Sequence, residues 1–388
     1  MNTLSRKSLT MLRGAVERAV ADQDYSLVRS AALAERARRL AGTLRNDRPD
    51  VESLFIVAHF MGLRYAELGP EGRGERDIAL ELFARCLIHG DEPVPRRLLP
   101  ELIPISFDLA VDLLQRYVHA RKPPPVAQVV EAWRRLERVT SGESPERAMV
   151  LANLKVALLM RFGETRDMTD LDEAIIVGRQ AVDAATADDP DRVRYLIHLG
   201  DTLQMRIKQT QTASDLDEIV EVWREALRAL PGDSAERLDL LGRLGGALVL
   251  RFGPGQAETE ADLDEAIALF RQAVQAAPAG HPDRDKHLSN LSTALEIRAE
   301  VRGEAADREE ARTIREEAAK ATTVSPGNID GRGGPDDPPG LQGGATPAET
   351  GPERLWTERP ERPTPVTQPT VRRQQRKRQS RRERRSGS

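Results

Sequence analysis

Residues 262–278 read Asp-Leu-Asp-Glu-Ala-Ile-Ala-Leu-Phe-Arg-Gln-Ala-Val-Gln-Ala-Ala-Pro, and this stretch decides the fold class of the 388-residue chain. Its apolar residues recur three, four and seven positions apart, which places them on one face of a helix. We expect Asp262 to cap the start of this helix, Glu265 to complete a capping box and Pro278 to end it. The stretch predicts an amphipathic helix whose apolar stripe must be buried against another element. That stripe consists of Leu263, Ala266, Ile267, Phe270, Ala273, Val274 and Ala277.

Similar stretches begin at residues 170 and 215, so the offsets between the three copies are 45 and 47 residues. A second amphipathic segment precedes each copy and also follows the last one. Neither apolar stripe can be buried alone, so the two helices must pair and the pairs must stack. The columns that recur in the second segment are Arg161, Arg206, Arg251 and Arg298; Leu151, Leu196, Leu241 and Leu288; and Leu154, Leu199, Leu244 and Leu291.

These helix pairs resemble the tetratricopeptide repeat (TPR) superfamily. The motif Leu-x-x-Leu-Gly-x-x-Leu, which starts at Leu196 and Leu241, resembles the first helix of that repeat, with leucine in place of its usual Trp and Tyr. The second helix of the repeat has small, aromatic, small and proline residues at fixed positions. In this chain those positions are occupied by Ala266, Phe270, Ala273 and Pro278.

The repeat of this chain is longer than the TPR repeat of about 34 residues. In this respect it resembles repeats of actinobacterial proteins that often carry a CHAT-type (caspase-like) peptidase domain. The resemblance is strongest over residues 145–300 and extends over 100–323. It implies an all-α fold, a right-handed α-solenoid of TPR-like helix pairs with a 45–47-residue repeat, followed by a disordered C-terminal tail.

We expect three regions along the chain. Residues 1–120 form an irregular N-terminal helical region with degenerate repeats, and residues 121–323 form the TPR-like array. The last helix of the array is expected to be a polar cap, because arginines replace three of its apolar positions. Residues 324–388 form a disordered Pro/Gly-rich linker and an Arg-rich tail, since residues 324–370 hold ten prolines and eight glycines and few large apolar residues. The cap arginines are Arg308, Arg312 and Arg315.

No catalytic, cofactor-binding or metal-binding residues are predicted, and the chain is expected not to be an enzyme. Cys86 is the only cysteine and falls in a column of buried alanines, so it is expected to be structural rather than a nucleophile paired with His89. The sequence has no P-loop, no HExxH and no disulfide framework. The recurring Asp and Glu residues are interpreted as helix caps. With no apolar signal segment and no membrane-length apolar run, a cytoplasmic location is expected.

The last eighteen residues carry nine basic residues and one acidic residue, so a net charge of +8 there leaves −12 for the rest of the chain. Such a tail is expected to bind nucleic acid or another polyanion through phosphate-type contacts. Contact with the acidic body, self-association between chains and a tail without function stay open as alternatives. The nine candidate polyanion-binding residues are Arg372, Arg373, Arg376, Lys377, Arg378, Arg381, Arg382, Arg384 and Arg385.

The TPR resemblance implies that the first helices line a concave groove that binds a protein or peptide partner. The mapped positions lack the regular Lys/Asn/Arg set with which some TPR proteins hold a terminal carboxylate, and an ordinary solvated helix face is the alternative interpretation. We therefore expect a non-enzymatic interaction scaffold. Two alternatives are a nucleic-acid-associated protein and the sensor module of a CHAT-type peptidase system that lacks the catalytic domain. The candidate groove residues are Asn153, Arg194, His198, Asp201, Asp239, Arg243, Lys286 and Asn290.

Overall fold

The computed structural model describes residues 3–44, 50–90, 93–210, 213–253 and 257–323. These residues form α-helices and two short 3-10 turns, and no β-strand occurs among them. The predicted all-α class is confirmed. The predicted linker and Arg-rich tail, 324–388, lie outside the described residues. The helices are α1 (Thr3–Ala21), α2 (Ala31–Thr43), α3 (Val51–Leu68), α4 (Arg73–His89), α5 (Leu99–His119), α6 (Val126–Val139), α7 (Arg147–Thr165), α8 (Met168–Ala184), α9 (Arg192–Thr210), α10 (Leu216–Ala229), α11 (Ala235–Arg251), α12 (Ala257–Ala276), α13 (Arg284–Arg302) and α14 (Ala305–Thr323).

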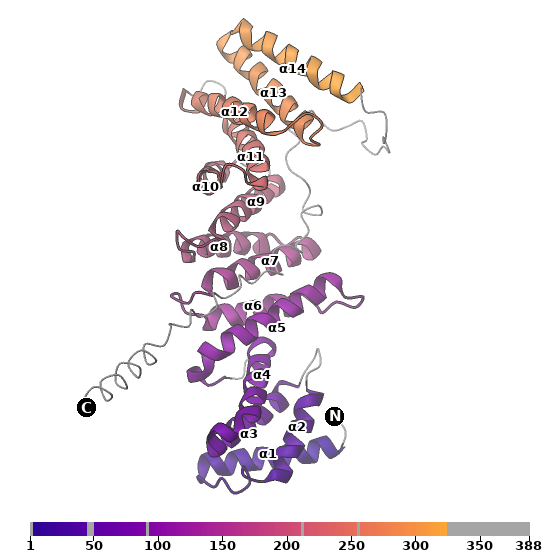
Figure 1. Cartoon of the computed structure of the whole chain (residues 1–388), viewed down its shortest axis with the longest axis vertical. Helices are drawn as coiled ribbons and strands as arrows, with labels where there is room; N and C mark the ends of the chain where they lie inside the picture. Colours follow the sequence, from indigo (N-terminus) through magenta and orange to yellow (C-terminus); the bar gives the residue numbers. More distant parts are fainter. Residues whose placement is uncertain (1–2, 45–49, 91–92, 211–212, 254–256, 324–388) are drawn as a thin grey trace, which may run out of the picture. The chain divides into compact units, whose positions relative to one another are not determined.

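The helices follow one another in chain order from α1 to α14 (Figure 1). We call α7, α9, α11 and α13 the A helices, and α6, α8, α10, α12 and α14 the B helices. Each A helix packs against the B helix that follows it and against the B helix that precedes it. This is the stacking of helix pairs that the two apolar stripes predict, because each stripe is buried only when both neighbours are present.

The recurring leucines form the core of the stack. Leu154, Leu199, Leu244 and Leu291 are all at most 4% exposed. The last helix, α14, packs on α13 and buries Ala311 and Ile314. Arg308, Arg312 and Arg315 of α14 are exposed, and two of them still contact α13, Arg308 through the carbonyl of Ala299 and Arg315 through Glu296.

Two glycines of the A helices make room for aromatic rings of the B helices. A Cβ on Gly200 would lie 2.1 Å from Nε1 of Trp223, and a Cβ on Gly245 would lie 2.7 Å from the ring of Phe270. Both rings are completely buried. The indole of Trp223 donates a hydrogen bond to the carbonyl of Ile197 at 3.3 Å. The glycines in this column are therefore required by side-chain volume rather than by backbone conformation.

In the preceding pair the sizes are exchanged. Lys155 of α7 stands in the column of Gly200, and Gly178 of α8 stands in the column of Trp223. A Cβ on Gly178 would lie 3.2 Å from Cδ of Lys155. The lysine stem thus occupies space that an aromatic ring fills in the next pair. In both repeats one large side chain and one glycine meet at this place, but the large side chain comes from opposite helices. Close packing of a core requires such matching of volumes.

Three of the four recurring aspartates lie inside their helices, contrary to the sequence-based expectation that they cap them, and the fourth, Asp215, stands at the N-cap of α10 without a side-chain capping bond. Asp262 lies inside α12, where it is 6% exposed and accepts two hydrogen bonds of 2.7 Å from Arg251. The helix starts at Ala257, so the predicted capping box does not form there. The helix α8 is capped by Asp167, whose side chain accepts from the amide of Thr169.

Each recurring aspartate is instead the buried partner of the recurring arginine at the end of the A helix. The pair bridges the two helices of one repeat, and both members would be left charged and poorly hydrated if separated. Removing the arginine would leave the aspartate charged and buried without a partner, which is unfavourable. The four pairs are Arg161–Asp170, Arg206–Asp215, Arg251–Asp262 and Arg298–Asp307.

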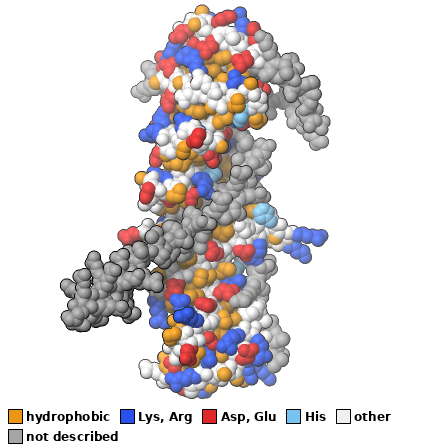
Figure 2. Space-filling model, viewed as in Figure 1, with side chains coloured by type: hydrophobic (Ala, Val, Ile, Leu, Met, Phe, Trp, Pro, Cys, Tyr) orange, Lys and Arg blue, Asp and Glu red, His pale blue; other side chains and the backbone are white. Residues whose placement is uncertain are grey.

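A second series of ion pairs connects successive B helices. Arg179 holds Glu218 through two hydrogen bonds of 2.6 Å, and its side chain is 42% exposed. Basic and acidic side chains are interspersed on the face shown in Figure 2. Exposed pairs contribute roughly 0–1 kcal/mol each, so this series adds less than the buried one. Its members are Arg134–Glu173, Arg179–Glu218, Arg224–Glu265 and Arg271–Glu310.

The first arginine of each A helix satisfies carbonyl groups at the end of the preceding B helix. The guanidinium of Arg192 donates to the carbonyls of Val182 at 2.6 Å and Ala185 at 3.0 Å. These carbonyls lie at the C-terminal end of a helix, where the helix itself supplies no N–H donor to bond them. The arginines that make this contact are Arg147, Arg192, Arg237 and Arg284.

Candidate partner-binding face

Each A helix has a stripe of side chains on the side opposite its buried leucines. Met160 follows the buried Leu151 by nine residues. At 100° per residue this places Met160 180° around the helix from Leu151, on the opposite side of α7. Residues at helical spacing from Met160 share that side. We call the sixteen equivalent residues of the four A helices the A-helix face. They are Met149, Asn153, Val156 and Met160; Arg194, His198, Asp201 and Met205; Asp239, Arg243, Gly246 and Leu250; and Lys286, Asn290, Thr293 and Ile297.

All eight predicted groove residues fall on this face, but they differ in accessibility. The side chains of Arg194 and Asp239 are 44% and 47% exposed, and Lys286 is half-buried. Asn153 and Asn290 are buried, at 6% and 8% exposure. The amide of Asn153 donates to the carbonyl of Met149 at 2.8 Å. Asn153 therefore bonds back to its own helix and is closed to another molecule, whereas the exposed Arg194 and Asp239 can be reached from outside.

Four of the predicted residues form one charged network between α9 and α11. Arg243 donates to Asp201, and its Nε lies 2.5 Å from a carboxylate oxygen of Asp239. The imidazole of His198 lies 3.8 Å from Asp201. Burial opposes the charge of Asp201, but the contacts with His198 and Arg243 outweigh it and lower the pKa of this carboxyl. Burial also lowers the pKa of His198, which favours the neutral ring.

Lys155 belongs to the same region and was missed by the sequence analysis. It is 5% exposed, and burial lowers the pKa of its ammonium to about 8, against the opposing attraction of Asp201. The signal was present, because a lysine stands where the next two repeats have Gly200 and Gly245. Only the aligned columns show that this lysine must be buried.

His287 is a second residue that the sequence analysis did not select. It is 1% exposed, and a Cβ on Gly242 would lie 2.8 Å from its ring. Neither ring nitrogen has a hydrogen-bond partner in the described part of the chain. Burial lowers the pKa of His287, so the neutral form is favoured. It therefore acts as a packing group between α11 and α13.

The last position of each stripe forms an apolar column, which the sequence analysis also missed. Leu250 is 55% exposed, and the other three members are partly exposed. Each member directly precedes one of the recurring arginines, so the column could have been read from the repeat alignment one turn beyond the selected residues. Its members are Met160, Met205, Leu250 and Ile297.

Gly246 leaves an open space beside this column. A Cβ placed on it would meet no atom within 4 Å, in contrast to Gly200 and Gly245. A glycine inside a helix costs roughly 1 kcal/mol relative to alanine. No packing within the described residues accounts for it, and close approach by another chain would.

The remaining candidates for chemistry lie apart from this face. Cys86 is completely buried in α4, and the imidazole of His89 lies 3.2 Å from the amide of Gln128. Among the described residues, no cluster of three His, Cys, Asp or Glu side chains could hold a metal ion, and no helix is long and apolar enough to cross a membrane. The nine predicted tail residues lie outside the described part of the chain.

No protein-family model and no curated protein matches this chain. Solved structures that are similar to it include two crystal structures of the nearly identical TPR-like repeats of a Podosopora anserina kinesin light chain, one of them a point variant. Each is 18% identical and superposes with a TM-score of 0.39. The matches cover 60% of this chain and 97% and 98% of the solved chains. The fold assignment rests on the packing of the helix pairs themselves.

Proposed function

We propose that this chain is a non-enzymatic scaffold that binds a peptide, a helix or a partner domain on the A-helix face. The supporting observation is the column of Met160, Met205, Leu250 and Ile297, which places one large apolar side chain on each of the four A helices, exposed at Leu250 and partly exposed at the other three. Exposed apolar residues that recur in this way mark interaction surfaces. Two of the four are methionines, whose flexible side chains adapt to different partner shapes.

The charged side chains at the first position of the stripe would orient a bound partner. Arg194, Asp239 and Lys286 alternate in sign from one A helix to the next at the first position of the stripe. A partner would meet apolar surface at one end of these helices and alternating charge at the other. Charges at the edge of an interface select partners and set the association rate more than they set affinity.

Aspartate substitutions in the apolar column are expected to abolish partner capture. Full-length chain carrying Met205→Asp and Leu250→Asp should retain less than about a tenth of the proteins that the unchanged chain captures from an extract of its native host, because a desolvated carboxylate would face the partner. Quantitative mass spectrometry of the captured proteins measures this. Ile176→Asp is the control, since Ile176 is 52% exposed on the B helix α8. Equal capture by both variants would contradict the proposal.

The Arg-rich tail supports a second proposal, binding of nucleic acid. The observation that favours it is the run of nine basic residues within positions 371–388. If six or more of them contact phosphates, raising the salt from roughly 50 to 200 mM should weaken duplex DNA binding about a thousandfold or more. Fluorescence anisotropy with the full chain and with a chain ending at residue 323 measures this. Unaltered affinity after truncation would refute a nucleic-acid role for the tail.

The relation to CHAT-type peptidases is a further proposal and rests on the long repeat alone. It assigns the array a sensor role, with the A-helix face in contact with the peptidase. A peptidase encoded beside this chain would provide the binding partner for a direct test with the Met205→Asp and Leu250→Asp variant.

A further inference from the structure

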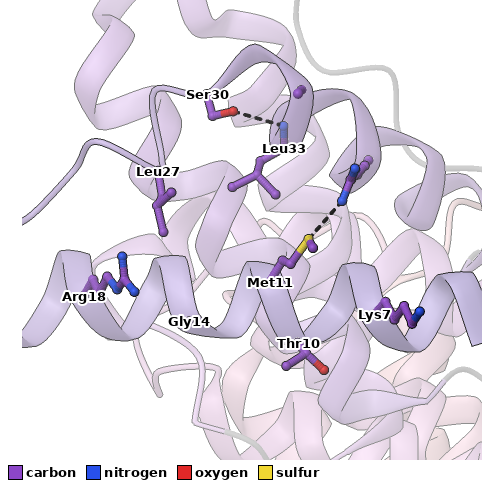
Figure 3. Close-up of a pocket in the computed structure, with 10 residues that line it drawn as sticks. Lys7, Thr10, Met11, Gly14, Arg18, Leu27, Ser30 and Leu33 are labelled. Carbon is purple, nitrogen blue, oxygen red and sulfur yellow. Dashed lines mark hydrogen bonds between the residues drawn. The ribbon is translucent and has the colours of Figure 1, made fainter.

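A groove separates α1 and α2 at the start of the chain, far in sequence from the A-helix face. Its volume is about 780 Å³. Figure 3 shows Lys7, Met11, Gly14 and Arg18 along one side of α1, with Leu27 and Leu33 facing them from the other wall. The α1 residues are spaced by four, three and four positions, which is the spacing of one helix face.

The floor of the groove is apolar and its rim is basic. Met11 is 48% exposed although it is a large apolar residue. Lys7, Arg18 and Arg36 line the groove, and among the described residues none of the three forms an ion pair with a carboxylate. Arg36 donates to the sulfur of Met11 at 2.9 Å.

The charge of Asp24 acts on Arg18, but no ion pair joins the two among the described residues. The charge of Arg18 contributes to the lowered pKa of Asp24, but the main cause is the bond that the carboxylate accepts from Ser26. The helix α1 as a whole has four basic residues and a single acidic one, Glu17. The groove therefore presents uncompensated positive charge around an apolar floor.

Gly14 is the second observation that points to a bound molecule. It lies in the middle of α1, yet a Cβ placed on it would meet no atom within 4 Å. Its backbone has ordinary helical geometry, so conformation does not require glycine. Glycine in a helix interior is unfavourable by about 1 kcal/mol, and close approach of a bound molecule is one reason to keep it.

We propose that this groove binds an acidic amphipathic helix of a partner protein. Lys7 and Arg18 are eleven residues apart, which corresponds to about 16 Å along the helix axis. A partner helix of about three turns would fill that length, with its apolar face on Met11 and Leu33 and its carboxylates at both ends. Helix-in-groove binding of this kind uses apolar anchors at spacings of three, four and seven residues.

Charge argues against two occupants from this chain, α1 of a second copy and the Arg-rich tail. A second copy of α1 would bring its own basic residues against the same rim, and like charges in an interface are costly. The Arg-rich tail has the same sign. Carboxylate-bearing helices from another protein complement both the floor and the rim.

The test uses the full chain and a fluorescent synthetic helix of about fourteen residues, with leucines in heptad positions and glutamates at both ends. Anisotropy should show binding that weakens with salt. The double variant Lys7→Glu, Arg18→Glu should bind at least about tenfold more weakly. Gly14→Leu should have a similar effect, because the added side chain fills the groove while the charges remain. Its thermal unfolding should be unchanged or slightly higher, which separates a blocked groove from a misfolded chain.

Arg39→Glu is the matched control, because Arg39 lies on the same pair of helices, is 73% exposed and does not line the groove. It should leave the affinity within about twofold. Equal binding of the unchanged chain and the Gly14→Leu variant would refute the proposal. So would equal binding of a peptide with glutamine in place of glutamate. If phosphatidylserine vesicles bind the chain and the peptide does not, the groove faces lipid and the proposal is wrong. Because none of these residues lies on the A-helix face, the outcome is independent of the proposed scaffold function.

Discussion

Replacing Gly200 by leucine is expected to lower the free energy of unfolding by about 3 kcal/mol. A Cβ at this position would lie 2.1 Å from the indole nitrogen of Trp223, which is completely buried between α9 and α10. The ring cannot move away without leaving the core, so the added carbons overpack the pair. The expected loss is large relative to the stability of a typical domain. Urea denaturation followed by circular dichroism measures it.

The preceding repeat suggests how the damage can be repaired. It pairs Lys155 with Gly178 where the next repeat pairs Gly200 with Trp223. Gly200→Lys alone should destabilise by overpacking, and Trp223→Gly alone should cost about 3–5 kcal/mol by leaving a cavity. The double variant should be more stable than the sum of the two losses predicts by about 1–3 kcal/mol, since the lysine stem then fills the cavity. Additive losses would contradict the exchange of volumes.

Gly246→Ala is the control for this cycle. Gly246 lies one residue after Gly245 on α11, but a Cβ there would meet no atom within 4 Å. Alanine should therefore leave stability unchanged or raise it by up to about 1 kcal/mol. A large loss of stability in the Gly246→Ala variant would contradict the inference that Gly200 is required by the volume around it and Gly246 is not.

The fold class could be predicted from the sequence because it depends on apolar spacing that repeats. Four copies of the leucine columns define the pairs, and the boundaries of the helices follow to within a few residues. The role of Asp262 could not be predicted in the same way. An aspartate at the start of an apolar stripe suits a helix cap and suits a salt bridge equally well. Only the folded pair shows that Arg251 reaches it and that the helix begins earlier.

The sequence predicted which residues lie on the A-helix face but not which of them are buried. Position in the repeat identifies which side of an A helix is available, so Arg194, His198 and Asp239 could be selected from sequence alone. Burial depends on the neighbouring repeats, which differ in side-chain volume. Asn153 and Lys155 are buried because of residues on other helices, and no property of α7 alone reveals it.

Lys155 provides the second large effect, and this effect depends on pH. Its pKa in the folded chain is about 8, compared with a value of 10.5 for an exposed lysine. Between these two values the unfolded chain holds a proton that the folded chain releases, so the folded state gains stability as pH rises from about 8 to 10.5. Below pH 8 both states are protonated, and the folded state bears the full cost of the buried charge. That cost is about 3 kcal/mol, at 1.36 kcal/mol for each pH unit.

Lys155→Met is therefore expected to raise the free energy of unfolding by about 3 kcal/mol at pH 7, because the apolar stem stays packed on Gly178 and the charge is removed. The difference between the variant and the unchanged chain should shrink towards zero as pH approaches 10.5. Urea denaturation at pH 7, 9 and 10.5 measures both chains, and comparison of the two cancels the titration of other groups. Lys122→Met, at an exposed lysine, is the control and should show no such trend. A difference that stays constant with pH would show that the pKa of Lys155 is not shifted, and a less stable variant at pH 7 would show that the attraction of Asp201 outweighs desolvation.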